Sequence, residues 1–156
     1  MPTTASVSTT AEARLGSTLQ ITGSNRGDQT WVYVLNEDSV DFTVGDVVMR
    51  NTTSTDYKAV LATAGTLIHG LRVIGVAQHL IAAGSYGYVL RRGIGTIQVG
   101  SGASVSDIEA LTSGGVEAGS VIKFAAGTTA PACVFGMAVA NISSSGTGNA
   151  FFDCRG

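Results

Sequence analysis

The stretch Val73-Ile-Gly-Val-Ala77 returns 61 residues later as Val134-Phe-Gly-Met-Ala138. At the same offset, Gly87 corresponds to Gly148. Apolar and β-branched residues on both sides of a glycine favour a strand, and the glycine itself predicts a bulge or the close approach of another backbone.

The two copies share further features in the same order. Gly45-Asp-Val-Val48 is echoed by Gly119-Ser-Val-Ile122, and the copies close on Arg92-Gly93 and Arg155-Gly156. Single matches arise by chance in a chain with 21 glycines, but the shared order favours a repeat. We therefore predict two similar β-hairpin units, residues 45–93 and 119–156, in one β domain over residues 17–156.

Short apolar runs broken by Gly, Asn, Asp and Ser fill the rest of this domain, and most have the length of strands. In Trp31-Val-Tyr-Val-Leu35 both parities are apolar, so we expect that strand to be covered on both faces. Ser106-Asp-Ile-Glu109 has capping-box spacing and predicts a helix of two turns at most. The runs are 17–22, 30–35, 42–44, 47–50, 57–61, 67–78, 86–92, 96–99, 120–124, 132–140 and 150–155.

These patterns predict an all-β protein, a pseudo-duplicated β-sandwich or open barrel. Residues 1–16 are rich in Ser, Thr and Ala and predict either an extended N-terminal arm or a disordered tail.

Composition limits the classes of partner. Charged residues make up 13% of the 156 residues and the net charge is −2, without a cluster of basic residues. Phosphate binding needs such a cluster, so we expect no nucleic-acid partner. No apolar run has the length of a membrane span and the N-terminus does not resemble a signal peptide, so we expect no membrane association and folding in a cytosol.

The two cysteines, Cys133 and Cys154, lack metal-type spacing. Buried free thiols are the favoured interpretation in a reducing compartment, and a cross-strand disulfide is the alternative.

Residues with catalytic or metal-binding chemistry are scarce. His69 and His79 have no ligand partners at metal-binding spacing, no Gly-x-Ser-x-Gly elbow is present, and Glu37, Asp38 and Asp41 fit a solvated turn better than a calcium loop. We predict no enzymatic activity, no cofactor and no metal.

Four residues are candidates for protein interaction. Trp31 and Tyr33 could form an aromatic platform for a sugar, although core packing is favoured. Arg91 and Arg92 close a predicted strand, so they should point to opposite faces, where one could pair with a carboxylate of a neighbouring subunit or remain solvated.

The string Gly45-Asp-Val-Val48, then Val73-Ile-Gly-Val-Ala77, then Ile81-Ala-Ala-Gly-Ser-Tyr-Gly87 leading into Val89, resembles a family of small phage capsid-associated proteins. Some members of that family are decoration, or cement, proteins. The resemblance covers about residues 45–156, and Ser143-Ser-Ser-Gly-Thr-Gly148 departs from the family's usual last turn. It implies a β-sandwich or β-tulip-like fold, trimerisation at symmetry-related capsid positions and no catalysis.

The leading functional hypothesis is a capsid decoration subunit on the virion exterior. Its partners would be the major capsid protein and two further copies of itself, and it would bind at capsomer junctions. The alternative is a carbohydrate- or receptor-binding module of a phage tail fibre or spike.

Overall fold

The computed structural model describes residues 7–51, 53, 56–62, 73–113, 117–124 and 134–154. These residues form strands and turns without a helix, which confirms the all-β prediction; the described part thus contains no helix able to cross a membrane. The strands are β1 (Thr18–Ser24), β2 (Gly27–Asn36), β3 (Val47–Arg50), β4 (Lys58–Leu61), β5 (Val73–Val76), β6 (Tyr86–Gln98), β7 (Ala110–Ser113), β8 (Val121–Lys123), β9 (Val134–Ala138) and β10 (Thr147–Asp153).

Five strands pair in a closed circuit, which we call the first ring. β2 pairs parallel with β4 and antiparallel with the first half of β6. β4 pairs with β3, β3 with β5, and β5 with β6, all antiparallel, so the pairing returns to β2. β1 is added to the same edge of β2 that β4 uses farther along the strand.

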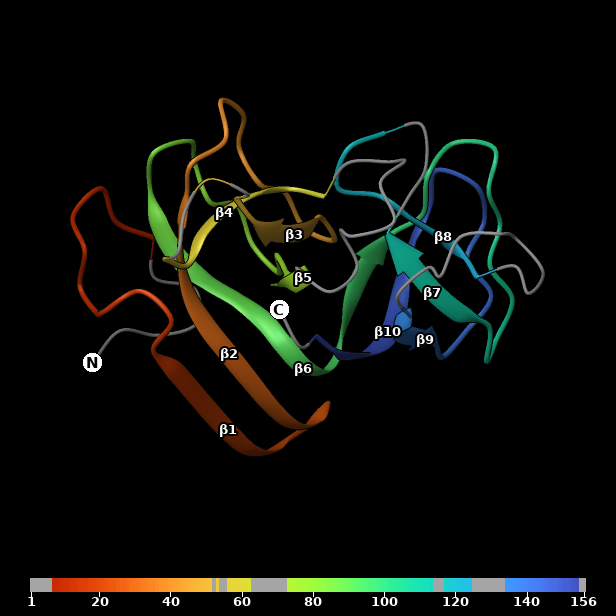
Figure 1. Cartoon of the computed structure of the whole chain (residues 1–156). Coiled ribbons are helices and arrows are strands. Elements are labelled where there is room, and N and C mark those ends of the chain that lie inside the picture. The colour runs from red at the N-terminus through yellow and green to blue at the C-terminus, as the bar shows by residue number, and fades with distance from the viewer. Residues whose placement is uncertain are drawn as a thin grey trace.

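A second ring repeats this order. The second half of β6 pairs with β10, β10 with β9, β9 with β7, and β7 with β8, all antiparallel. A parallel bridge between Val99, just after β6, and Val121 of β8 closes the circuit. β6 therefore belongs to both rings and runs from one to the other in Figure 1.

The two Val-x-Gly-x-Ala stretches start at the first residues of β5 and β9 and make up these strands, which have the same position in the two rings. Gly75 pairs with Val48 of β3, and Gly136 pairs with Leu111 of β7, each next to a register shift. A Cβ on Gly75 would lie 2.8 Å from the carbonyl oxygen of Leu90, and one on Gly136 would lie 2.7 Å from that of Phe151. These glycines thus allow a neighbouring backbone to approach closely, as the sequence predicted.

The predicted equivalence of Gly45–Val48 with Gly119–Ile122 is wrong. The first segment leads into β3 and the second into β8, whereas strand order makes β7 the counterpart of β3. Residue 108 takes the place of Gly45. The amides of Gly45 and Ile108 donate to the carbonyls of Ala77 and Ala138, at 2.8 and 3.0 Å, and both residues have positive φ.

The predicted helix at Ser106–Glu109 is also wrong. These residues form the turn before β7, in which a Glu109 carboxylate oxygen accepts from the Ser106 amide at 2.6 Å. In the turn before β3, an Asp46 carboxylate oxygen accepts from the Thr43 amide at the same distance. The capping-box spacing therefore belongs to a turn that both rings use.

β6 is one strand where the sequence predicted two, Tyr86–Arg92 and Thr96–Val99. Gly93 and Gly95 lie between the two predicted runs, and each is at a position where another group leaves no room for a side chain. A Cβ on Gly93 would lie 2.8 Å from the Asp28 carbonyl oxygen, and one on Gly95 would lie 2.5 Å from a methyl carbon of Leu90.

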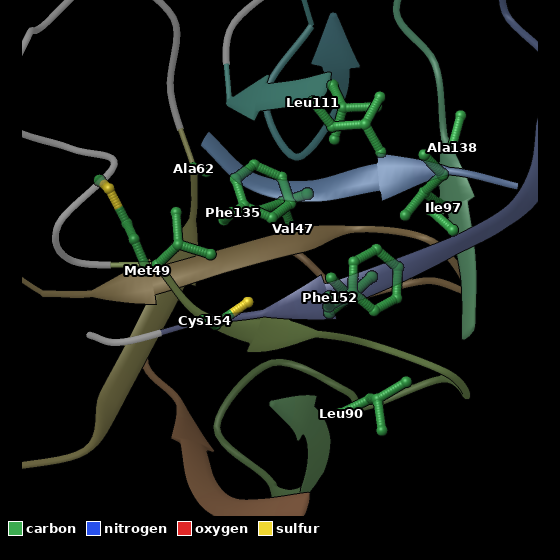
Figure 2. Close-up of a cluster of buried hydrophobic side chains, with 14 of the residues drawn as sticks. Val47, Met49, Ala62, Leu90, Ile97, Leu111, Phe135, Ala138, Phe152 and Cys154 are labelled. Carbon is green, nitrogen blue, oxygen red and sulfur yellow. The ribbon is translucent and has the colours of Figure 1, made fainter. Parts of the chain in front are cut away.

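The buried side chains form two clusters. One fills the first ring and consists of Val32, Val34, Phe42, Val48, Ala59, Ile74, Ala77, Ile81 and Val89. The other joins outward-facing side chains of the first ring to the interior of the second, and Figure 2 shows Val47 and Met49 of β3 in it with Phe135 and Phe152 of the second ring. Because successive β2 residues enter different clusters, both faces of that strand are covered, as predicted.

Residues 7–16 lie against their own chain. The backbone of Ser8 exchanges two hydrogen bonds with that of Tyr86, and the Gly16 amide donates to the Tyr33 carbonyl at 2.8 Å. Ala13 and Leu15 pack on the buried cluster that joins the rings. Residues 1–6 lie outside the described part.

Candidate functional site

The two aromatic candidates are in the core. Trp31 is 6% exposed and Tyr33 is 1% exposed. The Tyr33 ring lies 4.9 Å from that of Tyr88 and 6.0 Å from that of Tyr86, and its hydroxyl accepts from the Glu12 amide at 3.0 Å. The core interpretation is therefore confirmed, and neither ring offers a free face to a sugar.

Arg91 and Arg92 lie in the middle of β6 and do not close a strand. The Arg91 Nε donates to the carbonyl oxygen of Cys154 at 3.2 Å, close to the end of β10. Arg92 is exposed and lines a groove of about 410 Å³ between β1, β2 and β10. The pairing of either arginine with another subunit stays a prediction.

The groove beside Arg92 is mainly polar. Asp28 supplies its second charge, and Phe151 contributes an aromatic side chain. The Gln29 side chain in the groove wall is already hydrogen-bonded within the chain, because its amide donates to the Ile94 carbonyl at 2.8 Å. The remaining lining residues are Gln20, Ile21, Thr22 and Thr30.

The described cysteine, Cys154, is a free and buried thiol. Burial raises the pKa of Cys154 to about 12, with a smaller contribution from the charge of Asp153. The thiolate is the reactive form, so this sulfur is unreactive near neutral pH. Cys133 lies outside the described residues, and its thiol state stays a prediction.

Polar groups that could have carried chemistry serve the fold. Glu37 forms an ion pair with Lys58 at 3.0 Å, and an Asp38 carboxylate oxygen accepts from the Leu61 amide at 2.9 Å. His79 is half-buried, burial lowers its pKa, and its Nε2 has no hydrogen-bond partner among the described residues. His69 lies outside that part, within which no three potential metal ligands come together.

Large apolar side chains are exposed on β9 and β10, a feature that the sequence analysis missed. Val134 and Met137 of β9, Val139 directly after β9, and Phe151 of β10 form what we call the β9–β10 face. Met137 and Phe151 pair directly across the two strands. A sequence signal was available, because residues 134 to 152 contain no Asp, Glu, Lys, Arg or His.

Comparison with known proteins gives a structural likeness and no match in sequence. No family model and no curated protein matches the sequence. Among solved structures, the chain is similar to the N base of the head fibre protein gp8.5 of bacteriophage phi29. The TM-score is 0.49 at 15% identity, over 79% of this chain and 94% of that chain. At this level of similarity, no residue role is transferred to this chain.

The residues that resemble the phage capsid-associated family serve the ring fold. Asp46 accepts hydrogen bonds from the amide and the hydroxyl of Thr43 at 2.6 and 2.9 Å, and burial raises its pKa. Gly75 admits the backbone of β6, and a Cβ on Gly87 would lie 2.9 Å from a methyl carbon of Ile81. The shared pattern therefore specifies turns and close contacts.

Proposed function

We propose that this chain is a non-enzymatic structural protein of a phage particle, a decoration subunit that binds the outside of the shell at capsomer junctions. The observation that carries the proposal is the β9–β10 face, where large apolar side chains are exposed within a stretch, residues 134 to 152, that contains no charged residue. Exposed apolar patches of this kind are typical of protein–protein contacts.

Two further observations support this function. The low charge of the whole chain limits repulsion where many copies crowd on one surface. The two rings are joined by β6 and by the buried cluster that they share. The subunit can therefore transmit mechanical force between its neighbours as one block. The major capsid protein and further copies of the chain, in a trimer, are the proposed partners.

The tail-fibre alternative relied on Trp31 and Tyr33 as sugar-stacking residues. Their burial removes that platform. Trp31 fluorescence separates the two functions, since a buried indole should not be quenched by added sugars. A glycan array gives the independent measurement.

The direct test uses shells of the parent virus assembled without this protein. Purified protein should co-sediment with these shells and raise the temperature at which they disassemble. Shells that already carry their full complement serve as the control and should gain neither protein nor stability. If the protein neither binds nor stabilises the shells assembled without it, the proposal is wrong.

A further inference from the structure

The two rings can be compared residue by residue, because their strand pairing has the same register. Val47 pairs with Val76 as Ala110 pairs with Met137. Farther along, Val76 pairs with Leu90 as Met137 pairs with Phe151. Three outward-facing residues of the first ring, Val73, Val76 and Leu90, thus correspond to Val134, Met137 and Phe151 of the second.

The exposure of these equivalent residues differs sharply. Val73, Val76 and Leu90 are each 0% exposed, whereas Val134, Met137 and Phe151 are 48, 44 and 39% exposed. Equivalent apolar surfaces therefore occur on both rings. The one on the first ring is buried, and the one on the second ring is exposed.

The second ring helps to cover this surface on the first. Val73, Val76 and Leu90 share one buried cluster with interior residues of the second ring, and a methyl carbon of Leu90 lies against Gly95 in the second half of β6. Gln78, just after β5, donates to the Thr96 carbonyl at 2.9 Å and accepts from its amide at 2.8 Å. On the first ring, this apolar face, with Gln78 at its polar margin, is therefore covered by another ring of the same architecture.

From this internal precedent, we propose that the β9–β10 face is the surface through which a second copy of this chain binds. The inference rests on the part of the proposed function in which copies of the chain contact each other, and it names the contact surface. Residues 134 to 152 contain no charged side chain, so burying these residues costs little electrostatic energy, and Arg92 and Asp28 lie at the margin, in the groove that Phe151 also lines. Its central pair, Phe151 and Met137, comes from residue types enriched at interfaces.

The mass of the purified full-length chain in solution tests the proposal. Sedimentation velocity over a range of concentrations should show assemblies larger than the 15.8 kDa chain. Met137→Asp and Phe151→Asp should each weaken association roughly 30-fold or more, the scale of an interface hot spot. Leu80→Asp is the matched control, because Leu80 is exposed and apolar but lies outside the face; it should leave association unchanged.

If Met137→Asp or Phe151→Asp fails to fold, a measurement on the wild-type chain still tests the proposal. Hydrogen exchange of residues 134–139 and 147–153 should slow as protein concentration rises, while that of exposed residues in β1 should not. A chain that stays monomeric at high concentration, or an assembly that protects β1 instead, overturns the inference.

Shell binding is measured separately, so the two proposals fail separately. A monomeric wild-type chain that binds shells, and loses binding on Phe151→Asp, would assign the face to the shell protein. That result would overturn self-association and leave the proposed function standing.

Discussion

At the scale of single residues, Gly75 and Gly136 provide a paired test of the ring architecture. Adding a methyl group at either position places it within 3 Å of a carbonyl oxygen on the next strand, where the backbone must shift. We expect Gly75→Ala and Gly136→Ala each to lower the free energy of unfolding by about 1–3 kcal/mol, the usual cost of overpacking. Urea denaturation measures this loss.

Gly100→Ala is the control for these substitutions. A Cβ there would lie 2.8 Å from the Ser120 side-chain oxygen but 3.8 Å from the nearest backbone atom, the Val121 carbonyl oxygen. The Ser120 hydroxyl can rotate away if it gives up its hydrogen bond to the Glu117 carbonyl, whereas a strand backbone cannot move aside alone, so the loss should be smaller. An equal loss in all three variants would contradict the close-approach explanation.

His79 should make stability depend on pH. Burial lowers the pKa of His79 below its ordinary value of 6.5, so the unfolded state binds the proton more readily. Stability should therefore be fully present above pH 6.5 and fall as the pH drops through that value toward the lowered pKa of the folded state. His79→Gln should flatten this slope.

Thermal midpoints of both proteins between pH 5.5 and 8 provide the measurement. Asp46, whose pKa is raised by burial, is present in both chains and cancels in the comparison. Identical slopes in wild type and His79→Gln would show that the histidine does not contribute.

At the scale of elements, Gln78 completes the edge of β6 where β2 no longer pairs with it. Its amide both donates to and accepts from the backbone of Thr96, as a neighbouring strand would. Gln78→Leu retains the approximate size of the side chain and removes both bonds. We expect a loss of about 1–3 kcal/mol in unfolding free energy, because backbone groups are left without partners.

Gln20→Leu on β1 is the matched control, since Gln20 is exposed. Surface substitutions of this kind usually change stability by about 0.5 kcal/mol or less. Equal urea midpoints for the two variants would argue that water replaces the Gln78 amide.

The sequence predicted elements best where local pattern and long-range packing agree. β3 matches its predicted range, and the β-branched residues around Gly75 and Gly136 marked β5 and β9. β6 was divided wrongly because Gly93 and Gly95 are also typical of a turn; only the positions of Asp28 and Leu90 explain them.

The interaction surface was less predictable. Trp31 and Met137 both occur in apolar strands, but one is covered by tertiary packing and the other is not. Local alternation identifies the two faces of a strand and does not say what lies over each. The charge-free stretch was visible, whereas its exposure depended on the arrangement of the rings.

At the scale of the whole molecule, we expect the two rings to unfold as one unit. β6 belongs to both, and a second set of contacts crosses between them. The Val47 amide donates to the Gly119 carbonyl and the Gly119 amide to the Ala62 carbonyl, each at 2.8 Å. Neither ring can separate without exposing the shared apolar cluster.

Ile74→Ala in the first ring and Phe135→Ala in the second test this coupling. We expect losses of about 2–5 and 3–5 kcal/mol, the usual costs of such core truncations. Trp31 fluorescence reports β2 of the first ring and the shared cluster to which the indole belongs, and circular dichroism reports all strands. Phe135→Ala should shift both signals to the same lower urea midpoint, although Phe135 is in the ring without the tryptophan. If the Trp31 transition stays in place while part of the circular dichroism signal moves, the rings unfold independently and the single-block description fails.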